Sequence, residues 1–456
     1  MRPEGGGASR RGRLPGQQAG EAETVHRWRV KGEQVTAPSA EEIPRITEKL
    51  FRHEAGKLVS MLTGIFGITR LQLAEDVVQD AMIRALQTWP YTGVPDNPSA
   101  WLMQTAKNRA LDVIRREKFF HDKQPEIITS LEQWVPEEAD PKFDDEIKDD
   151  RLRLIFACCH PLLPQDAQTA LALKTLCGFS PGEIASAFLS TEVAVAKRLT
   201  RARQKIAELG IPFEIPAGQA LTERLDGVMR VIYFLFNEGY SASTGDSVVR
   251  EDLCFEAIRL ASLLVAHPVA DRPKLHALLA LMFMNGARLS AREDRQGNIL
   301  RLKDQDRSLW DKSMIGHGLL HLASAAQGGE LSEFHFQAGI AACHCVAESD
   351  ETTDWKRILG YYDQWSAISG SPVVTLNRAV ALARVHGPEA GMGALEAVLE
   401  KGELDSYYLL HAVMGDLEER LNHPKAAEDH FGKAIQLTGV KSEQAFLAKR
   451  LMDCRG

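Results

Sequence analysis

The sequence lacks the features of membrane proteins, secreted proteins and the common nucleotide-binding or hydrolytic enzymes. No apolar run approaches the roughly 20 residues that span a bilayer, and no secretory hydrophobic segment is present. A Walker loop, a dinucleotide-binding glycine fingerprint and a GxSxG turn are all missing. We therefore expect a cytoplasmic protein with no membrane contact, no catalytic residue and no cofactor, rather than an enzyme.

Metal-ligand patterns are equally sparse. Seven cysteines, an odd number without regular spacing, are typical of free thiols in a reducing compartment. His317 and His321 lie four residues apart on an expected helix, so one face offers both to a metal, but no HExxH glutamate accompanies them. Cys343 and Cys345 point to different helix faces. We therefore predict no metal site.

Composition divides the chain into segments with different roles. At 456 residues the chain is too long for a single hydrophobic core. Residues 1–40 contain few large apolar side chains and are expected to be disordered. Residues 119–150 carry a run of acidic side chains interrupted by Pro136 and Pro141, which predicts an extended linker. Elsewhere apolar residues recur at helical spacing and strand-like alternation is nearly absent, so we predict an all-α fold.

The most specific local pattern lies at residues 179–209, FSPGEIASAFLSTEVAVAKRLTRARQKIAEL. Ser180 and Glu183 can form a capping box, with a proline at the first helical position. Ser190 or Thr191 can cap a second helix after a tight turn. That second helix has a predicted buried seam of Val195, Leu199, Ala202 and Ile206. The pair of helices predicts a helix-turn-helix.

The second helix of this pair is basic, although the whole chain carries a formal net charge of −8. Its other faces carry Lys197, Arg198, Arg201, Arg203 and Lys205. A helix of this kind can lie in the major groove, where its cations meet phosphates and base edges. A solvated basic helix in an ordinary bundle is the alternative interpretation, and a helix-turn-helix alone also fits repressors and activators.

Two helical segments before the acidic linker carry distinct polar faces. In the first, the apolar stripe of Val78, Met82, Ala85 and Trp89 leaves a largely acidic face made of Glu75, Asp76, Gln79, Asp80 and Arg84. In the second segment, the side chains expected to face inward are Trp101, Ala106, Ala110 and Ile114. Its C-terminal end is cationic and hydrogen-bonding, and consists of Lys107, Asn108, Arg109, Asp112, Arg115, Arg116 and Lys118. Such side chains can hold a DNA backbone or read an unstacked base.

In this order, the segments resemble the sigma-70 superfamily of bacterial RNA polymerase sigma factors, in the extracytoplasmic-function arrangement. AEDVVQDAMIRALQTW looks like the part of region 2 that docks on the coiled coil of the polymerase clamp. AWLMQTAKNRALDVIRR looks like the part that melts and reads the minus-ten element, and the RLTRARQKI ending is similar to region 4, which reads the minus-thirty-five element. The resemblance implies region 2 at residues 41–118 and region 4 at residues 151–212.

The resemblance also implies partners and site residues. The partners would be the RNA polymerase core, through its clamp coiled coil and flap, and promoter DNA. Polymerase-core contacts would come from Glu75, Asp76, Gln79, Asp80 and Arg84. Minus-ten contacts would come from Trp101, Lys107, Asn108, Asp112, Arg115 and Arg116. Minus-thirty-five contacts would come from Thr191, Glu192, Ala194, Lys197, Arg198, Arg201, Arg203 and Lys205.

Residues 213–456 form a helical C-terminal extension that neither sigma region requires. Two stretches near its end share one pattern, in which a helix is followed by a turn with Pro388 or Pro424 and then by a second helix. The two stretches are spaced by about 34 to 36 residues, which predicts tetratricopeptide-like hairpins. We expect this extension to regulate the protein through a regulatory protein, a small ligand or contact with the sigma regions. The alternatives are a helix-turn-helix repressor or activator with such a sensor, and an interaction scaffold with a vestigial helix-turn-helix.

Overall fold

The computed structural model of the chain describes residues 43–116, 129, 149–188, 190–210, 213–242, 249–294, 298–329 and 331–454. The segment predicted to be disordered, 1–40, and almost all of the predicted acidic linker, 119–150, lie outside the described residues. Within them the chain is built from α-helices and short 3-10 turns, with one isolated β-bridge between Glu293 and Ile299. The prediction of an all-α fold is confirmed.

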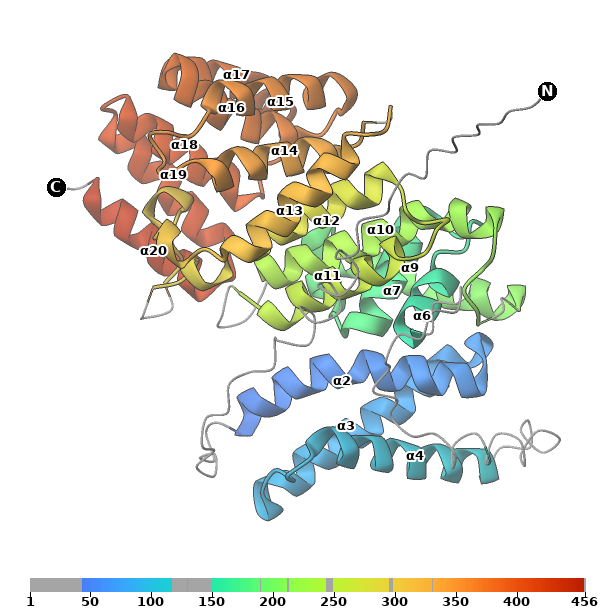
Figure 1. Ribbon diagram of the computed structural model, residues 1–456. Helices are drawn as coiled ribbons and strands as arrows, with labels where there is room; N and C mark the ends of the chain where they lie inside the picture. Colours follow the sequence, from blue (N-terminus) through green and yellow to red (C-terminus); the bar gives the residue numbers. More distant parts are fainter. Residues whose placement is uncertain are drawn as a thin grey trace, which may run out of the picture.

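The N-terminal helical unit consists of α2 (Ile43–Phe66), the 3-10 turn η1 (Ile68–Arg70), α3 (Leu71–Thr92) and α4 (Pro98–Arg116). Figure 1 shows these helices as the lower layer of the molecule. The predicted inward stripe of α3 is confirmed, because Val78, Ala85 and Trp89 are buried and Met82 is half-buried. Trp89 meets Trp101 of α4 edge to face, with ring centroids 5.4 Å apart.

The helix-turn-helix unit consists of α6 (Asp150–Cys158), α7 (Gln165–Cys177), α8 (Pro181–Ala187) and α9 (Glu192–Leu209). The predicted capping box of α8 is present: Ser180 Oγ accepts a hydrogen bond from the Glu183 N–H at 3.1 Å, and the Glu183 carboxylate accepts one from the Ser180 N–H at 2.7 Å. Thr191 caps α9 by accepting from the Ala194 N–H at 3.3 Å. All four predicted seam residues of α9 are buried. The helix-turn-helix prediction is confirmed.

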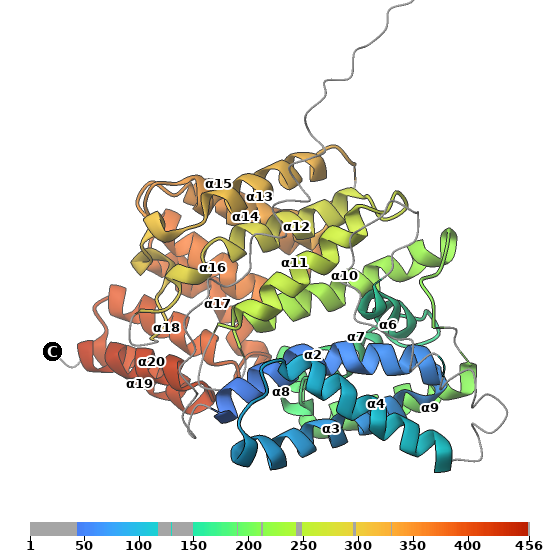
Figure 2. The ribbon, with the colours of Figure 1, turned by 60° about the horizontal axis from the view of Figure 1, so that its bottom comes forward.

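The C-terminal extension is a curved array of antiparallel helices (Figures 1 and 2). Its helices are α10 (Gln219–Tyr240), α11 (Glu251–Val265), α12 (Pro273–Gly286), α13 (Lys312–Ala325), α14 (Glu333–Val346), α15 (Trp355–Ile368), α16 (Pro372–His386), α17 (Pro388–Lys401), α18 (Tyr408–Arg420), α19 (Pro424–Leu437) and α20 (Lys441–Asp453). The 3-10 turns η3 (Leu289–Ala291), η4 (Leu302–Asp304) and η5 (Arg307–Leu309) separate α12 from α13. The two hairpins predicted from the sequence are α16–α17 and α18–α19, and helix pairing already begins with α10 and α11.

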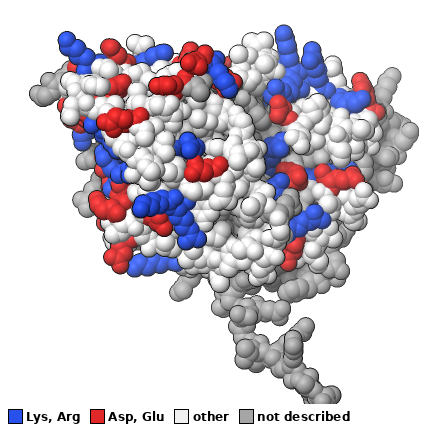
Figure 3. All heavy atoms as spheres, turned by 90° about the horizontal axis from the view of Figure 1, so that it is seen from above, with Lys and Arg blue, Asp and Glu red and all other residues white. Residues whose placement is uncertain are grey.

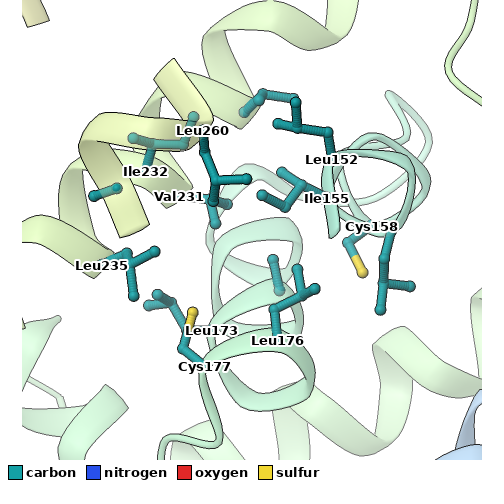
Figure 4. Packing of buried hydrophobic residues seen from close by; sticks show 14 of the residues in the cluster. Leu152, Ile155, Cys158, Leu173, Leu176, Cys177, Val231, Ile232, Leu235 and Leu260 are labelled. Carbon is teal, nitrogen blue, oxygen red and sulfur yellow. The ribbon is translucent and has the colours of Figure 1, made fainter. Parts of the chain in front are cut away.

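The N-terminal helical unit, the helix-turn-helix unit and the first helices of the extension share one continuous hydrophobic core. Figure 4 shows side chains from α6, α7, α10 and α11 interdigitating, among them Leu152, Ile155, Leu173, Leu176, Val231, Leu235 and Leu260. Burial of this apolar surface stabilises the contact by about 25 cal/mol per Å². The predicted boundary between region 4 and the extension therefore does not separate two independent cores.

Ion pairs reinforce this shared core at its edge. Glu256 of α11 pairs with Arg151 of α6, and Arg259 of α11 reaches Asp149, the N-cap of α6, at 2.8 Å. Burial alone would raise the pKa of Glu256, but Arg151 and Arg259 beside it hold that pKa at about 2. The carboxylate is therefore ionised and paired, which a buried charge requires.

The face opposite the N-terminal helical unit is chemically mixed. Seen from above in Figure 3, Lys and Arg side chains alternate with Asp and Glu across a largely uncharged surface. Separately, none of the helices in the described ranges is both long and apolar enough to cross a bilayer.

Candidate nucleic-acid and polymerase interface

Helix α9 presents an exposed polar face on the side away from its buried seam. Capping by Thr191 fixes where the helix begins, and the seam fixes which way it is rotated, so the outward residues follow from both. The predicted minus-thirty-five residues that are exposed are Thr191, Glu192, Ala194, Lys197, Arg201 and Lys205. Three cations thus face solvent together with three hydrogen-bonding or small residues near the helix start.

Two predicted minus-thirty-five cations contact side chains of other elements. The Arg203 Nη2 donates to both carboxylate oxygens of Glu75 on α3, at 2.9 and 3.1 Å. Arg198 lies half-buried, with its Nη2 3.8 Å from Asp166 and its guanidinium 5.8 Å from the Phe188 ring centroid. Counting charges along α9 missed both contacts, because their partners lie on other elements.

The acidic face predicted on α3 is present except at its first residue. Asp76, Gln79, Asp80 and Arg84 are exposed, but the Glu75 side chain keeps only 15% of its exposure. Placing Glu75 on the outer face was wrong. The helix-turn-helix unit covers that position: the Thr175 hydroxyl of α7 donates to Glu75 at 2.9 Å, in addition to the Arg203 pair.

Helix α4 carries its predicted cationic face beside this acidic one. Asn108, Asp112, Arg115 and Arg116 are exposed, whereas Lys107 and Trp101 are half-buried, and Lys118 lies outside the described residues. Arg109 Nε bonds the Asp80 carboxylate at 2.7 Å, and both side chains are more than 40% exposed. This pair links the polar faces of α3 and α4 into one surface, although an exposed pair contributes about 1 kcal/mol or less.

The histidine and cysteine positions singled out in the sequence have packing roles. His317 stacks on Phe283 with centroids 5.5 Å apart, and His321 Nδ1 lies 2.8 Å from His276 Nδ1. Burial and the neighbouring His276 lower the pKa of His321 to about 4. Across the part of the chain that the structure describes, no three His, Cys, Asp or Glu side chains gather as metal ligands.

The buried thiols have no activating environment. Burial raises the pKa of Cys159 and of Cys177 to about 12, and raises the pKa of Cys158 well above its usual value. All seven cysteines of the chain are free thiols. Because the thiolate is the reactive form, these buried residues behave as small apolar side chains.

Comparison with known families agrees with this geometry. The family Sigma-70 region 2 matches residues 50–120, and the family Sigma-70 region 4 matches residues 153–206. A family of unknown function, DUF6596, matches residues 224–326. A protein of Rhizobium meliloti (strain 1021), named "Uncharacterized protein R00370", is 41% identical over 382 residues, covering 84% of this chain and 90% of that protein. No solved structure matches the chain significantly.

The matches to Sigma-70 region 2 and Sigma-70 region 4, in this order, define a DNA-binding protein that acts in transcription initiation. The chain belongs to the sigma-70 superfamily, as a sigma factor of the extracytoplasmic-function type with a helical C-terminal extension. The N-terminal helical unit is its region 2 and the helix-turn-helix unit its region 4. RNA polymerase core and promoter DNA are the partners of proteins with these two regions.

Proposed function

We propose that the protein directs initiation at a restricted set of promoters, with α3 docking on the polymerase clamp, α4 reading the minus-ten element and α9 reading the minus-thirty-five element. In this proposal the C-terminal extension regulates that activity. The observation that carries it is the presence of two separate exposed polar faces, one on α3 and α4 and one on α9, each rotated outward by a buried apolar stripe.

Duplex reading by α9 is supported by the charge and position of its exposed side chains. Lys197, Arg201 and Lys205 recur every four residues and so lie along one side of the helix. Residues at the start of a recognition helix contact base edges, and cations further along contact phosphates. Thr191 and Ala194 stand at that start.

Capture of the opened minus-ten strand is supported by α4. Its last turns expose Asn108 and Asp112, which can hydrogen-bond a base edge, beside Arg115 and Arg116, which can hold the backbone. Unstacking a base costs a few kcal/mol, so this step needs the polymerase contacts that α3 would provide. The clamp face of α3 would consist of Asp76, Gln79, Asp80 and Arg84.

A regulatory role of the extension is supported by its shared core with region 4. Interdigitated side chains transmit displacement, because a close-packed interior has few voids to absorb it. A regulatory protein or small ligand that shifts α10 or α11 therefore acts on the position of α9 through α6 and α7.

In-vitro transcription with core polymerase tests the assignment of faces. Arg201→Glu is expected to weaken promoter binding at least tenfold while core binding is unchanged, since attraction between a cation and the DNA phosphates turns into repulsion. Asp76→Lys is expected to weaken core binding while promoter binding is unchanged. Lys425→Glu, which makes the same charge reversal at an exposed position of the extension, is the matched control. Equal losses of both binding activities in both variants would overturn the division of roles.

A further inference from the structure

Helix α8, the first helix of the helix-turn-helix, is held at both ends by residues of the extension. It has only 7 residues, Pro181–Ala187, and so short a helix depends on tertiary contacts for its stability. At its start, the Glu183 carboxylate pairs with Arg250 at 3.3 Å. At its end, the ring of the C-cap residue Phe188 packs on Phe234 of α10, with ring centroids 5.1 Å apart. The turn that leads into α9 therefore rests on the extension.

The Phe188 ring also contacts the basic helix α9. The guanidinium of Arg198 lies 5.8 Å from the centroid of that ring, and its Nη2 lies 3.8 Å from Asp166. The Asp166 side chain keeps 61% of its exposure, so water screens this ion pair and it contributes little. The ring, by contrast, attracts the cation without neutralising it. Arg198 therefore keeps its charge, and its side chain keeps 28% of its exposure, so a phosphate can still approach it.

Further aromatic contacts within the extension fix the position of Phe234. The centroid of its ring lies 5.9 Å from that of Tyr233, which in turn lies 5.3 Å from that of Phe334 on α14. The Tyr233 hydroxyl donates to the Gln337 side chain of α14 at 2.8 Å. A row of rings thus runs from α14 through α10 and the end of α8 to Arg198 of α9.

We propose that Phe234 is a positioning residue for the contact of α9 with DNA: through the Phe188 ring, it holds Arg198 in place for a DNA phosphate. The inference rests on the proposed function, because it concerns the same helix α9. An arginine that is already held loses less conformational freedom on binding than one that moves freely. In this proposal α10, the helix in which the match to DUF6596 begins, is a working part of the DNA-binding unit.

The place of Arg198 along α9 favours a phosphate over a base as its target. It lies about two turns after the Thr191 cap. Residues at the start of a recognition helix contact base edges, whereas cations further along contact phosphates. A phosphate contact carries no sequence information, so Phe234 should affect the affinity for all duplexes alike.

A double-mutant cycle on the full chain tests this route, with a pool of random-sequence duplexes at low salt as the probe. Arg198→Gln should weaken binding about three- to tenfold and reduce the slope of log affinity against log salt concentration by about one. Phe234→Leu, which keeps an apolar side chain but removes the ring, should weaken binding about two- to fivefold. In the Arg198→Gln protein, Phe234→Leu should change binding by less than about 1.5-fold, because the residue through which it acts is gone.

Matched controls distinguish positioning of Arg198 from general support of the fold. Arg201→Gln removes an exposed cation of the same helix, and in that protein Phe234→Leu should keep its full effect. Phe446→Leu makes the same substitution at a half-buried ring of α20, whose centroid lies 5.7 Å from the Arg301 guanidinium. It should leave duplex binding unchanged.

The outcomes separate the inference from the proposed function. Equal effects of Phe234→Leu with and without Arg198 would overturn the inference, because Phe234 would then support region 4 in general, and so would an unchanged affinity in Phe234→Leu. Urea titration shows whether that protein is folded. If it is not, Phe234→Met, whose flexible side chain fills the space more closely, takes its place in the cycle. If the wild-type protein binds no duplex at any salt concentration, the proposed function is wrong and this inference falls with it.

Discussion

Glu183, whose carboxylate closes the capping box of α8, forms an ion pair with Arg250, the residue directly before α11, at 3.3 Å. Arg250 also pairs with Glu238 of α10 at 3.1 Å. The side chains of Glu183 and Glu238 retain 3% and 5% of their exposure. A residue of the C-terminal extension therefore neutralises the carboxylate that begins the helix-turn-helix.

Replacing Arg250 should damage region 4 from a distance. Arg250→Met removes the cation between two buried carboxylates, and we expect a loss of about 3–5 kcal/mol in the free energy of unfolding together with weaker duplex binding. Urea unfolding and DNA titration measure the two effects. Arg272→Met, at an exposed arginine, should cost less than about 1 kcal/mol. Similar losses of unfolding free energy in Arg250→Met and Arg272→Met would show that the ion pairs of Arg250 with Glu183 and Glu238 do not stabilise the protein.

Cutting the chain after Gly210 should not release a working sigma factor. The cut removes α10 and α11 and so exposes apolar side chains of α6 and α7, such as Leu152 and Leu173, that are fully buried in the full chain. We expect helical circular dichroism without cooperative unfolding, together with aggregation. A fragment that unfolds cooperatively and transcribes like the full chain would contradict this expectation.

Acid should destabilise the extension through His344. Burial, followed by the nearby Arg288 and Arg307, lowers the pKa of His344 to about 3. The imidazole is then neutral in the folded protein, whereas the unfolded chain takes up a proton below about pH 6.5. Stability is therefore lost as the pH falls from about 6.5 toward 3, by about 2 kcal/mol at pH 5.

The contribution of His344 can be isolated by comparison with His344→Gln. The difference in unfolding free energy between wild type and variant should shift by about 2 kcal/mol, in the variant's favour, between pH 7 and pH 5. Urea titrations at the two pH values measure it. A difference that is the same at both values would mean that His344 is protonated in the folded protein.

Two glycines of the hairpin α18–α19 should respond in opposite ways to the same substitution. A Cβ at Gly415 would lie 2.7 Å from the Phe431 ring, which is itself buried, so Gly415→Ala should cost about 1–3 kcal/mol. Gly432 has no atom within 4 Å of its added Cβ, so Gly432→Ala should stabilise by up to about 1 kcal/mol. Thermal melting measures both. A stabilising Gly415→Ala would show that the hairpin has room for a methyl group beside the Phe431 ring.

Much of the site was predictable because its signals are local. The capping box at Ser180, the cap at Thr191 and the seam from Val195 to Ile206 each involve residues within one or two helical turns, and all three agree with the structure. The acidic face of α3 followed in the same way from its apolar stripe, apart from Glu75.

The misplacement of Glu75 has a definite physical cause. Helical periodicity tells which side of a helix faces its own bundle, but gives no information on what a second unit covers. Arg203 and Thr175 lie 128 and 100 residues further along the chain than Glu75, and no local pattern connects them. The same reason hid the role of Arg250, whose partner Glu183 belongs to a different unit.

The sequence by itself determined the all-α fold, the order of region 2, region 4 and extension, and the outward faces of α3, α4 and α9, because periodicity and capping act over a few residues. Only the tertiary structure decided that region 4 and the extension share one core and that Glu75 and Arg203 neutralise each other. Those facts depend on which surfaces meet, and close packing between distant segments is set by the shape of the whole chain.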